Sequence, residues 1–336
     1  MIVLSGDVGG TNTRLQLTEH HKKSARQKFV KTYLAAEYKS LSEIIKQFLQ
    51  ESGIDSSAIN AACLAVAGPV KKGSVEFTNL PWGIAESELA QGLKLDIAKV
   101  KLINDFESIG YGIDTLTTSD LETLQQAESV ADAPIAILGA GTGMGMGIAV
   151  KCDDKTRVLP TEGGHQDFAP VNDEQIALFK YLKRRLHRVS IERICCGPGL
   201  VNIYRYVVDN PLYNQSESPE LRRLMHMGQD KAKLITKFAV EKGDPMSLRA
   251  VDIFIQVYGA VAGNLALSTL PKRGLYVVGG IAPKLISQIK DGRFIHAFID
   301  KGRMTELMKE IPVHVVMNTD VGLQGAAQYA YGLCQP

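Results

Sequence analysis

Two glycine-rich segments have the residue types of a phosphate-binding turn. They are Gly6-Asp7-Val8-Gly9-Gly10-Thr11 and the segment 139–145, whose central residues are Gly141, Thr142 and Gly143. Consecutive glycines let successive backbone N–H groups point into one concavity, which attracts an anion. Each segment also supplies a threonine hydroxyl as a further donor. Asp7 could hold a cation beside the phosphate, through water.

The alternative for each segment alone is a glycine-rich hairpin that binds nothing. The first segment lacks the Gly-Lys-Ser/Thr ending of a Walker A loop and the spacing of a dinucleotide-binding Gly-x-Gly-x-x-Gly turn. Both segments lie between two β-prone runs, in different halves of the chain. Two such turns, one in each half, favour a polyphosphate that is held from both sides.

Asn104 and Asp105 follow the apolar run 100–103, which has the pattern of a buried strand. Proteins of the α/β class bind their ligands at the carboxyl ends of such strands. A carboxylate there could accept the proton of an attacking hydroxyl group, which is the task of the base in phosphoryl transfer. The alternative is an Asn-Asp pair that only initiates a turn.

The loop 160–170 concentrates Glu162, His165 and Asp167 beside two glycines. Such acceptors and a histidine could bind a polyol through bidentate hydrogen bonds. One histidine with two carboxylates suits a metal site poorly. The alternative is a loop histidine that makes only a structural hydrogen bond.

Glu192 and the cysteines carry no catalytic signal by themselves. Glu192, within Ser190–Arg193, fits a capped helix start, and Cys195-Cys196 fits buried packing because vicinal cysteines rarely form a useful disulfide. The five cysteines are odd in number, scattered and in no C-x-x-C pair. Neither a zinc site nor a disulfide framework is therefore expected, and reduced thiols indicate a cytoplasmic protein.

An α/β arrangement must position these residues. In the first half, a hairpin surrounds the first turn, and the elements expected after it are strand 28–34, a helix from the capping box at Ser40 to Gly53, and strands 61–67 and 100–103. In the second half, strands 135–138 and 146–150 flank the second turn. The elements expected after them are helices 173–187, 199–208, 220–242 and 245–270, strands 275–278 and 313–317, and a closing helix 322–333.

The composition excludes several classes of protein. The 336 residues are enough for about two domains. Lys+Arg 38 against Asp+Glu 36 gives a formal net charge of +2, which provides no field for nucleic acid or an anionic membrane. No uninterrupted apolar run approaches the roughly 18 residues of a membrane span. Met1–Gly10 lacks the basic start of a signal peptide and includes Asp7.

A series of motifs, collinear over nearly the whole chain, resembles the bacterial glucokinase family. The motifs are GDVGGTN (6–12), AGPV (67–70), TNLPW (78–82), NDF (104–106), GAGTGMG (139–145), PTEGGHQDFAP (160–170), SIERICCGPGLVNIYR (190–205), GNLAL (263–267), VVGGIAPK (277–284), KGR (301–303), IPVHVV (311–316) and GLQGA (322–326). The EGGHxDFAP and ERxxxGPGLxNxYR stretches are quite specific to this family. The resemblance implies the two-lobed, actin-like (ribonuclease H-like) ATPase fold of hexokinases, with ATP and sugar in the cleft between two α/β lobes.

The resemblance also implies roles for single residues. Asp105 would be the general base that takes the proton from the 6-hydroxyl of D-glucose. The other sugar hydroxyls would be bound by Asn104, Glu162, His165 and Glu192. The two turns would hold the phosphates of ATP, with Mg²⁺ on the β- and γ-phosphates. Gly279 and Gly280 would lie near the adenosine.

The expected domains are a small α/β domain of residues 1–108 plus 312–336 and a large α/β domain of residues 109–311 with helical insertions. This division assumes that the closing strand and helix return to the first lobe. A homodimer is usual in the family and is expected here. Two departures stand out: Glu107-Ser108 where the family has small residues such as Thr-Ala, and Cys195-Cys196 where it has a leucine-serine-like pair.

Two other classes of function stay open. A sugar-sensing regulator of related fold would carry an N-terminal helix-turn-helix, whereas the first turn here begins at residue 6. An actin-like filament or chaperone ATPase would need no sugar-binding loop. Within the kinases, the sequence leaves open glucose, mannose or glucosamine as acceptor and ATP, ADP or polyphosphate as donor.

Overall fold

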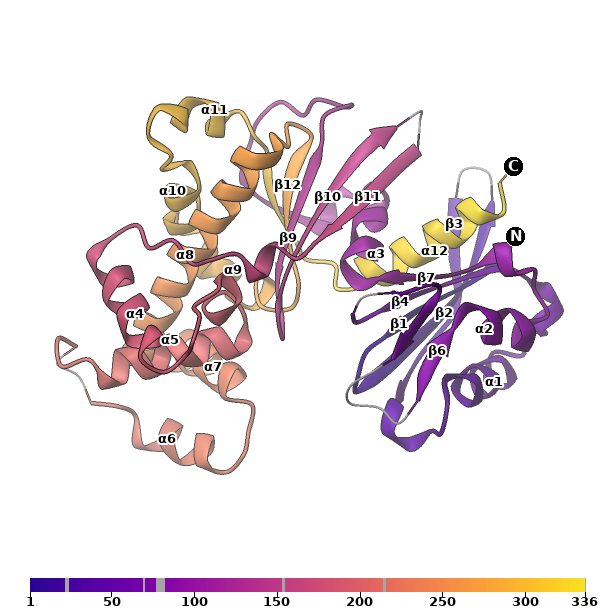
Figure 1. Cartoon of the computed structure of the whole chain (residues 1–336), viewed down its shortest axis with the longest axis horizontal. Helices are drawn as coiled ribbons and strands as arrows, with labels where there is room; N and C mark the ends of the chain where they lie inside the picture. The colour runs from indigo at the N-terminus through magenta and orange to yellow at the C-terminus, as the bar shows by residue number, and fades with distance from the viewer. Residues whose placement is uncertain (22–23, 69, 77–81, 153–154, 214–215, 336) are drawn as a thin grey trace. The chain divides into compact units, whose positions relative to one another are not determined.

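The computed structural model describes residues 1–21, 24–68, 70–76, 82–152, 155–213 and 216–335. The chain forms two compact units (Figure 1). The first unit is Met1–Thr117, Thr156–Pro160 and Asn318–Pro336, and the second is Thr118–Lys155 and Thr161–Met317. Residue 69 of the AGPV motif and residues 78–81 of TNLPW lie outside the described part of the chain.

The first unit is built on a five-stranded sheet in the order β3-β2-β1-β4-β7. The expected hairpin is present, because β1 (Ile2–Val8) pairs antiparallel with β2 (Asn12–His21), which pairs with β3 (Ser24–Leu34). On the other side, β4 (Ile59–Val66) runs parallel to both β1 and β7 (Val100–Asn104). A separate small hairpin is formed by β5 (Ser74–Glu76) and β6 (Gly83–Ala85). The carboxyl ends of β1, β4 and β7 therefore share one edge of the sheet.

Helices cover both faces of this sheet. Leu4 and Leu64 face α1 (Leu41–Ser52) and α2 (Glu86–Leu93), a helix that the sequence analysis missed. The helix α1 begins and ends as its sequence predicts: the Ser40 hydroxyl accepts a hydrogen bond from the Glu43 amide at 3.3 Å, and Gly53 has a φ of 67°.

The other face of the sheet packs against the closing helix. Val3 and Cys63 lie in one buried cluster with Ala326 and Ala330 of α12 (Val321–Leu333). Beside α12 runs the short helix α3 (Asp105–Gly112), which the sequence analysis did not predict (Figure 1). Because successive side chains of a strand point to opposite faces, the sheet has one hydrophobic cluster on each of its two faces.

The helices α3 and α12 approach so closely that only small residues fit between them. A Cβ on Gly325 would overlap the carbonyl oxygen of Ser108, and a Cβ on Gly112 would overlap that of Val321. The Ser108 hydroxyl is fully buried and donates to the carbonyl oxygen of Gly322. The departure from the family pattern at Ser108 is thereby explained, because a serine is small enough and its hydroxyl finds an acceptor on α12.

The second sheet has six strands in the order β11-β10-β9-β12-β13-β8, and apart from residues 156–160 of β11 they belong to the second unit. Around the second glycine-rich turn, β9 (Ile135–Ala140) and β10 (Met144–Cys152) form an antiparallel hairpin. The strand β12 (Gly274–Val278) runs parallel to β9 and to β13 (Val313–Val316). The edge strands are β11 (Lys155–Thr161) and β8 (Leu121–Gln125). Neither edge strand was predicted, because both alternate weakly and carry many polar residues.

The closing strand differs from its expected place. The expected small domain included residues 312–336, but β13 lies between β12 and β8 in the second sheet, and only α12 packs in the first unit. The reason is burial, since Val313 and Val315 are fully buried in the same cluster as Leu275 and Val277 of β12. The first unit also includes residues 109–117 and 156–160, beyond the expected range 1–108.

The rest of the second unit is largely helical, as expected between residues 173 and 270, whereas the three short helices between β12 and β13 were not predicted. The helices are α4 (Asp173–Lys183), α5 (Gly197–Asp209), α6 (Pro219–His226), α7 (Lys231–Lys242), α8 (Pro245–Thr269), α9 (Ile286–Ile289), α10 (Arg293–Ile299) and α11 (Thr305–Lys309). The expected helix 220–242 is two helices, because Gly228 has a φ of 79° and Asp230 caps α7 by accepting from the Lys233 amide.

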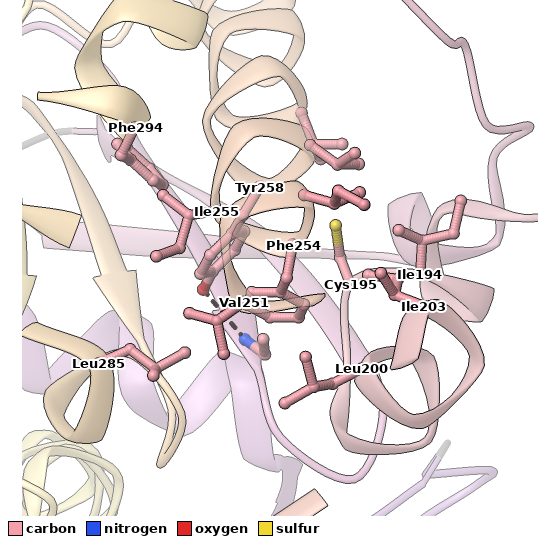
Figure 2. Packing of buried hydrophobic residues seen from close by; sticks show 14 of the residues in the cluster. Ile194, Cys195, Leu200, Ile203, Val251, Phe254, Ile255, Tyr258, Leu285 and Phe294 are labelled. Atoms are coloured by element: carbon pink, nitrogen blue, oxygen red, sulfur yellow. Dashed lines mark hydrogen bonds between the residues drawn. The ribbon is translucent and has the colours of Figure 1, made fainter. Parts of the chain in front are cut away.

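The central helix of the second unit, α8, is long and apolar enough to cross a membrane, by length and composition only. The polar residues Asp252, Gln256 and Asn264 interrupt it, so the sequence shows no continuous apolar run. In the structure, 72% of its most apolar window is buried inside the protein. Figure 2 shows Phe254 and Tyr258 of α8 in the main hydrophobic cluster, and α8 is thus a core helix.

Candidate active site

Three polar residues of the first unit lie at the carboxyl edge of its parallel strands. Asp7 is the penultimate residue of strand β1, Asn104 ends β7, and Asp105 begins α3. The Asn104 side chain accepts a hydrogen bond from the Phe106 amide at 2.9 Å and donates one to the carbonyl oxygen of Gly68 at 3.3 Å. Asn104 is therefore the N-cap of α3, and it fixes the residue that follows it.

Asp105 has the electrostatic environment of a general base. Burial raises the pKa of its carboxyl group above the ordinary value, the Phe106 amide opposes the shift, and the negative charge of Asp7 adds to it. Desolvation by the surrounding protein also raises the pKa of Asp7, although its side chain still contacts solvent, and the Arg14 guanidinium opposes this shift. A raised pKa makes Asp105 a stronger proton acceptor at neutral pH than an ordinary aspartate.

The first glycine-rich turn uses its residues in two ways. Gly6 lies within β1, where a Cβ would come within 2.6 Å of a methyl group of Leu64, and Val8 is fully buried, so both serve strand packing. The turn proper is closed by the Gly9 amide, which donates to the carbonyl oxygen of Asn12 at 2.9 Å. The remaining predicted residues of the segment are not buried, namely Asp7, Gly9, Gly10 and Thr11.

The second turn lies beside a pocket. The Gly141 amide donates to the carbonyl oxygen of Gly143, and the Gly197 amide at the start of α5 donates to that of Gly141, each at 2.9 Å. A Cβ on Gly141 would meet no protein atom within 4 Å. Neither Gly141 nor Gly143 has a positive φ, so a left-handed backbone is not the reason for glycine at these positions. At Gly141 the missing side chain instead leaves the backbone accessible to a ligand.

The pocket has a volume of about 880 Å³ and is lined only by the second unit. Of the predicted nucleotide-binding residues, Gly141, Thr142 and Gly280 line it. Its wall also carries residues that sequence analysis missed, among them Lys231, Lys233, Lys237 and Lys284. These four lysines outnumber the two carboxylates in the lining, Asp230 and Glu241. The pocket therefore favours an anionic ligand.

Two predicted nucleotide-binding glycines, Gly143 and Gly279, do not line this pocket. Gly279 has a φ of 88°, and a Cβ there would come within 2.7 Å of the carbonyl oxygen of Ala140. It therefore lets the end of β12 lie against the end of β9, where the second turn starts.

The same end of β9 is fixed from α8. The Tyr258 hydroxyl accepts a hydrogen bond from the Ala140 amide at 3.1 Å, drawn dashed in Figure 2, and burial raises the pKa of this hydroxyl. Ala140 directly precedes the second turn. The hydroxyl thus satisfies a buried backbone group that positions the turn.

Tyr258→Phe is expected to lower the free energy of unfolding by about 1–3 kcal/mol, because it leaves the buried Ala140 amide without an acceptor. Urea denaturation measures this change. Tyr331→Phe is the control, since the Tyr331 hydroxyl has no hydrogen-bond partner among the described residues. Equal stability of the Tyr258→Phe variant and the unchanged protein would show that the bond does not support the turn.

The loop that contains Glu162 and His165 lies against the second turn. A Cβ on Gly164 would overlap the carbonyl oxygen of Met144, so the loop packs directly on the start of β10. The side chains of Glu162 and His165 are exposed, with 3.9 Å between Oε2 and Nε2. Asp167 points elsewhere and forms an ion pair with Arg188 at 2.7 Å.

Glu192 belongs to the same surface of the second unit. The Ile191 amide donates to the carbonyl oxygen of Gln166 at 2.9 Å, which joins the segment of Glu192 to the loop of Glu162 and His165. The Glu192 Oε2 atom accepts a hydrogen bond from the Met144 amide at 2.9 Å. The second unit thus brings together the three predicted sugar-binding residues that it contains.

The vicinal cysteines have separate structural tasks. Cys195 points into the core formed by α5 and α8 (Figure 2). Cys196 caps α5: its Sγ accepts from the Gly199 amide at 3.2 Å and donates to the carbonyl oxygen of Glu192 at 2.9 Å. Burial raises the pKa of the Cys196 thiol to about 11, which keeps it protonated as this donor role requires.

Among the described residues, no group of three or more histidines, cysteines, aspartates or glutamates is arranged to hold a metal ion. A magnesium ion that arrives with a nucleotide needs less from the protein, because phosphates and waters fill most of its coordination sphere. The carboxylates of Asp7 and Asp105, which are close enough to influence each other electrostatically, suit this second kind of site.

Comparison with solved structures defines the class of protein. A glucokinase from an Antarctic psychrotroph superimposes with a TM-score of 0.86 at 28% identity, covering 98% of this chain and 99% of that chain. A glucokinase of the ROK family from Streptomyces griseus, solved with glucose and AMPPNP, has the same fold at 18% identity, with a TM-score of 0.66 and coverage of 99% and 100%. The fold is therefore the two-lobed, actin-like ATPase fold of sugar kinases, as expected.

Sequence comparison identifies the family within that class. The family profile described as Glucokinase matches residues 4–332. The glucokinase of a Nostoc species is 42% identical over 339 residues, which cover 97% of this chain and 98% of the relative. The chain belongs to the glucokinase family.

Proposed function

We propose that the protein transfers the γ-phosphoryl group of ATP to the 6-hydroxyl of D-glucose, with Asp105 as the general base. Membership of the glucokinase family supports the activity and ATP as donor. The role of Asp105 as the base is supported by its environment. Burial and the negative charge of Asp7 both raise the pKa of its carboxyl group. An enzyme of this family feeds glucose 6-phosphate into glycolysis.

The two units would contribute different binding groups. Asn104 and Asp105 of the first unit and Glu162, His165 and Glu192 of the second are proposed to hold the sugar through its hydroxyl groups. The pocket beside Gly141, Thr142 and Gly280 is proposed to hold the nucleotide, because its backbone is accessible and its lysines attract phosphate. The first turn, with Gly9, Gly10 and Thr11, is proposed to donate amide and hydroxyl hydrogens to the transferring phosphoryl group.

Mg²⁺ is proposed to bind with ATP, held by Asp7 through water. When bound, it would neutralise charge on the β- and γ-phosphates. Asp105 would orient the 6-hydroxyl and take its proton as the oxygen attacks phosphorus. Closure around the reactants would exclude water, which otherwise competes as acceptor.

Other properties are proposed from family and composition. The two compact units are proposed to be the two lobes of the fold. A homodimer is proposed because it is usual in the family. Residence in the cytoplasm is proposed from the unpaired cysteines, and neither nucleic acid nor a membrane is expected as a partner because the net charge is +2.

The purified protein is expected to consume ATP only when glucose is present. A coupled assay with glucose, mannose and glucosamine, each with ATP, ADP and polyphosphate, measures acceptor and donor specificity together. The highest kcat/KM is expected for glucose with ATP. ATP consumption that is the same without sugar would contradict the proposal and favour an actin-like filament or chaperone ATPase.

A further inference from the structure

We infer that Glu192 is a positioning residue for the nucleotide as well as a sugar ligand, because its carboxylate holds the glycine-rich turn that lines the nucleotide pocket. The inference rests on the proposed function and deepens it. Glucose and nucleotide binding are then coupled through one side chain of the second unit.

The first link is the hydrogen bond from the Met144 amide to the Glu192 Oε2 atom, at 2.9 Å. Met144 begins β10 and directly follows the second turn. A hydrogen bond to an ionised carboxylate is roughly twice as strong as one between neutral groups. The Glu192 carboxylate therefore fixes the exit of the turn, while the Tyr258 hydroxyl fixes its entry at Ala140.

The turn is built to admit this carboxylate. A Cβ on Gly143 would come within 2.7 Å of Glu192 Oε2, which is closer than van der Waals contact allows. Since Gly143 has no positive φ, a left-handed backbone does not explain the glycine. The approach of Glu192 does explain it.

The backbone around Glu192 returns to the same turn by a second route. The Cys196 thiol donates to the carbonyl oxygen of Glu192 at 2.9 Å, and the next residue, Gly197, donates its amide to the carbonyl oxygen of Gly141 at 2.9 Å. The Gly141 amide in turn donates to the carbonyl oxygen of Gly143. The hydrogen bonds thus form a closed ring that includes two residues of the pocket wall, Gly141 and Gly197.

A displacement of Glu192 must therefore change the pocket. When glucose binds, it orders the Glu192 side chain and with it the turn. A nucleotide that meets an ordered turn loses less conformational freedom on binding, so each ligand strengthens the other by the same factor. Couplings of this kind typically amount to about 5- to 150-fold in affinity.

The decisive measurement is nucleotide affinity in the absence of sugar. Titration calorimetry with ADP and AMPPNP is expected to show about 5- to 20-fold weaker binding for Glu192→Ala, within the usual range of such couplings. Glu192→Gln, which keeps an acceptor oxygen, is expected to recover most of the affinity. Glu192→Asp keeps the charge but is too short to reach the Met144 amide, and it is expected to behave like Glu192→Ala.

The controls are Glu162→Ala and His165→Ala, which remove the other proposed sugar ligands of the second unit. Neither side chain hydrogen-bonds to the turn among the described residues, so both variants should lose glucose affinity and keep nucleotide affinity. If Glu192→Ala and Glu192→Asp also keep full nucleotide affinity, the inference is wrong. The glucose-dependent ATP consumption of the unchanged protein would still stand, so the proposed function is tested separately.

A double variant tests the same contact from the other side. Gly143→Ala alone is expected to weaken nucleotide binding, because the added methyl group displaces the Glu192 carboxylate. In the Glu192→Ala background that methyl group has room, and the double variant should bind ADP no more weakly than Glu192→Ala does. Fully additive losses would overturn the inference, since additivity means that the two residues act independently. Thermal unfolding of each variant verifies that the protein is folded.

Discussion

Asp105→Ala is expected to lower kcat by about 10²–10⁴-fold, the usual contribution of a general base. The carboxylate lies at the start of α3, where it is held by the Asn104 cap and faces the charge of Asp7. Its removal takes away the proton acceptor and leaves the nucleotide pocket of the second unit unchanged. Steady-state kinetics with saturating glucose and ATP measure the effect. A kcat equal to that of the unchanged protein would exclude Asp105 as the base.

Replacing Asp105 is expected to harm catalysis but not to destabilise the fold. Burial raises the pKa of Asp105, so the folded protein holds the proton more tightly than the unfolded chain does. The free energy of unfolding therefore decreases as the pH rises from the pKa of aspartate in the unfolded chain through the raised pKa of Asp105 in the folded protein. This decrease persists at neutral pH. Asp105→Asn removes the buried charge, and we expect it to unfold at a temperature no lower than the unchanged protein at pH 7. This variant separates a loss of catalysis from a loss of folding.

The pH profile provides a further measurement on Asp105. The value of kcat/KM should fall on the acid side as Asp105 becomes protonated, and the midpoint should lie above the range of an ordinary aspartate. The residual activity of Asp105→Ala should lack this acid limb. An acid limb that is identical in both proteins would assign it to another group.

Gly325→Ala is expected to lower the free energy of unfolding by about 3 kcal/mol, at the upper end for overpacked interiors. The added Cβ would overlap the Ser108 carbonyl oxygen and come within 2.6 Å of the Gly112 amide nitrogen. Both are backbone atoms, which cannot rotate away as a side chain can, so α3 and α12 must separate. Because α3 begins at Asp105, kcat should fall as well.

Gly332→Ala is the matched control on the same helix. A Cβ at Gly332 would meet no protein atom within 4 Å, and alanine favours a helix over glycine by about 0.5–1 kcal/mol. Denaturant unfolding of both variants measures the difference. If Gly325→Ala is as stable as Gly332→Ala, the close contact between α3 and α12 is not as the structure has it.

The sequence predicted the elements with strong periodicity or clear ends. The hairpin around the first turn, the helix from Ser40 to Gly53 and the core helix α8 are all confirmed, because alternation, capping residues and glycine stops are local signals. The edge strand β8 and the helices α2 and α3 were missed. Their sequences are short and partly polar, and pairing with distant segments stabilises them.

The motifs predicted which residues belong to the candidate site, but not which contacts those residues make. The local pattern around Glu192 predicts only a capped helix start, and its role comes from the family motif alone. Its hydrogen bond to Met144 joins residues 48 positions apart, which no local pattern reveals. The lysines of α7 in the pocket wall gave no signal either, since a basic helix is usually just solvated. The burial that raises the pKa of Asp105 is likewise a property of the folded unit.

The contact between α12 and the first sheet determines when the first unit can be completed during synthesis. Val3, Ala61 and Cys63 are made early, but the alanines that cover them belong to residues 326–330. The ribosome must therefore finish the whole second unit before this face is covered. Until then the face presents apolar side chains that attract chaperones or a second nascent chain, so cotranslational folding can finish the second unit before the first.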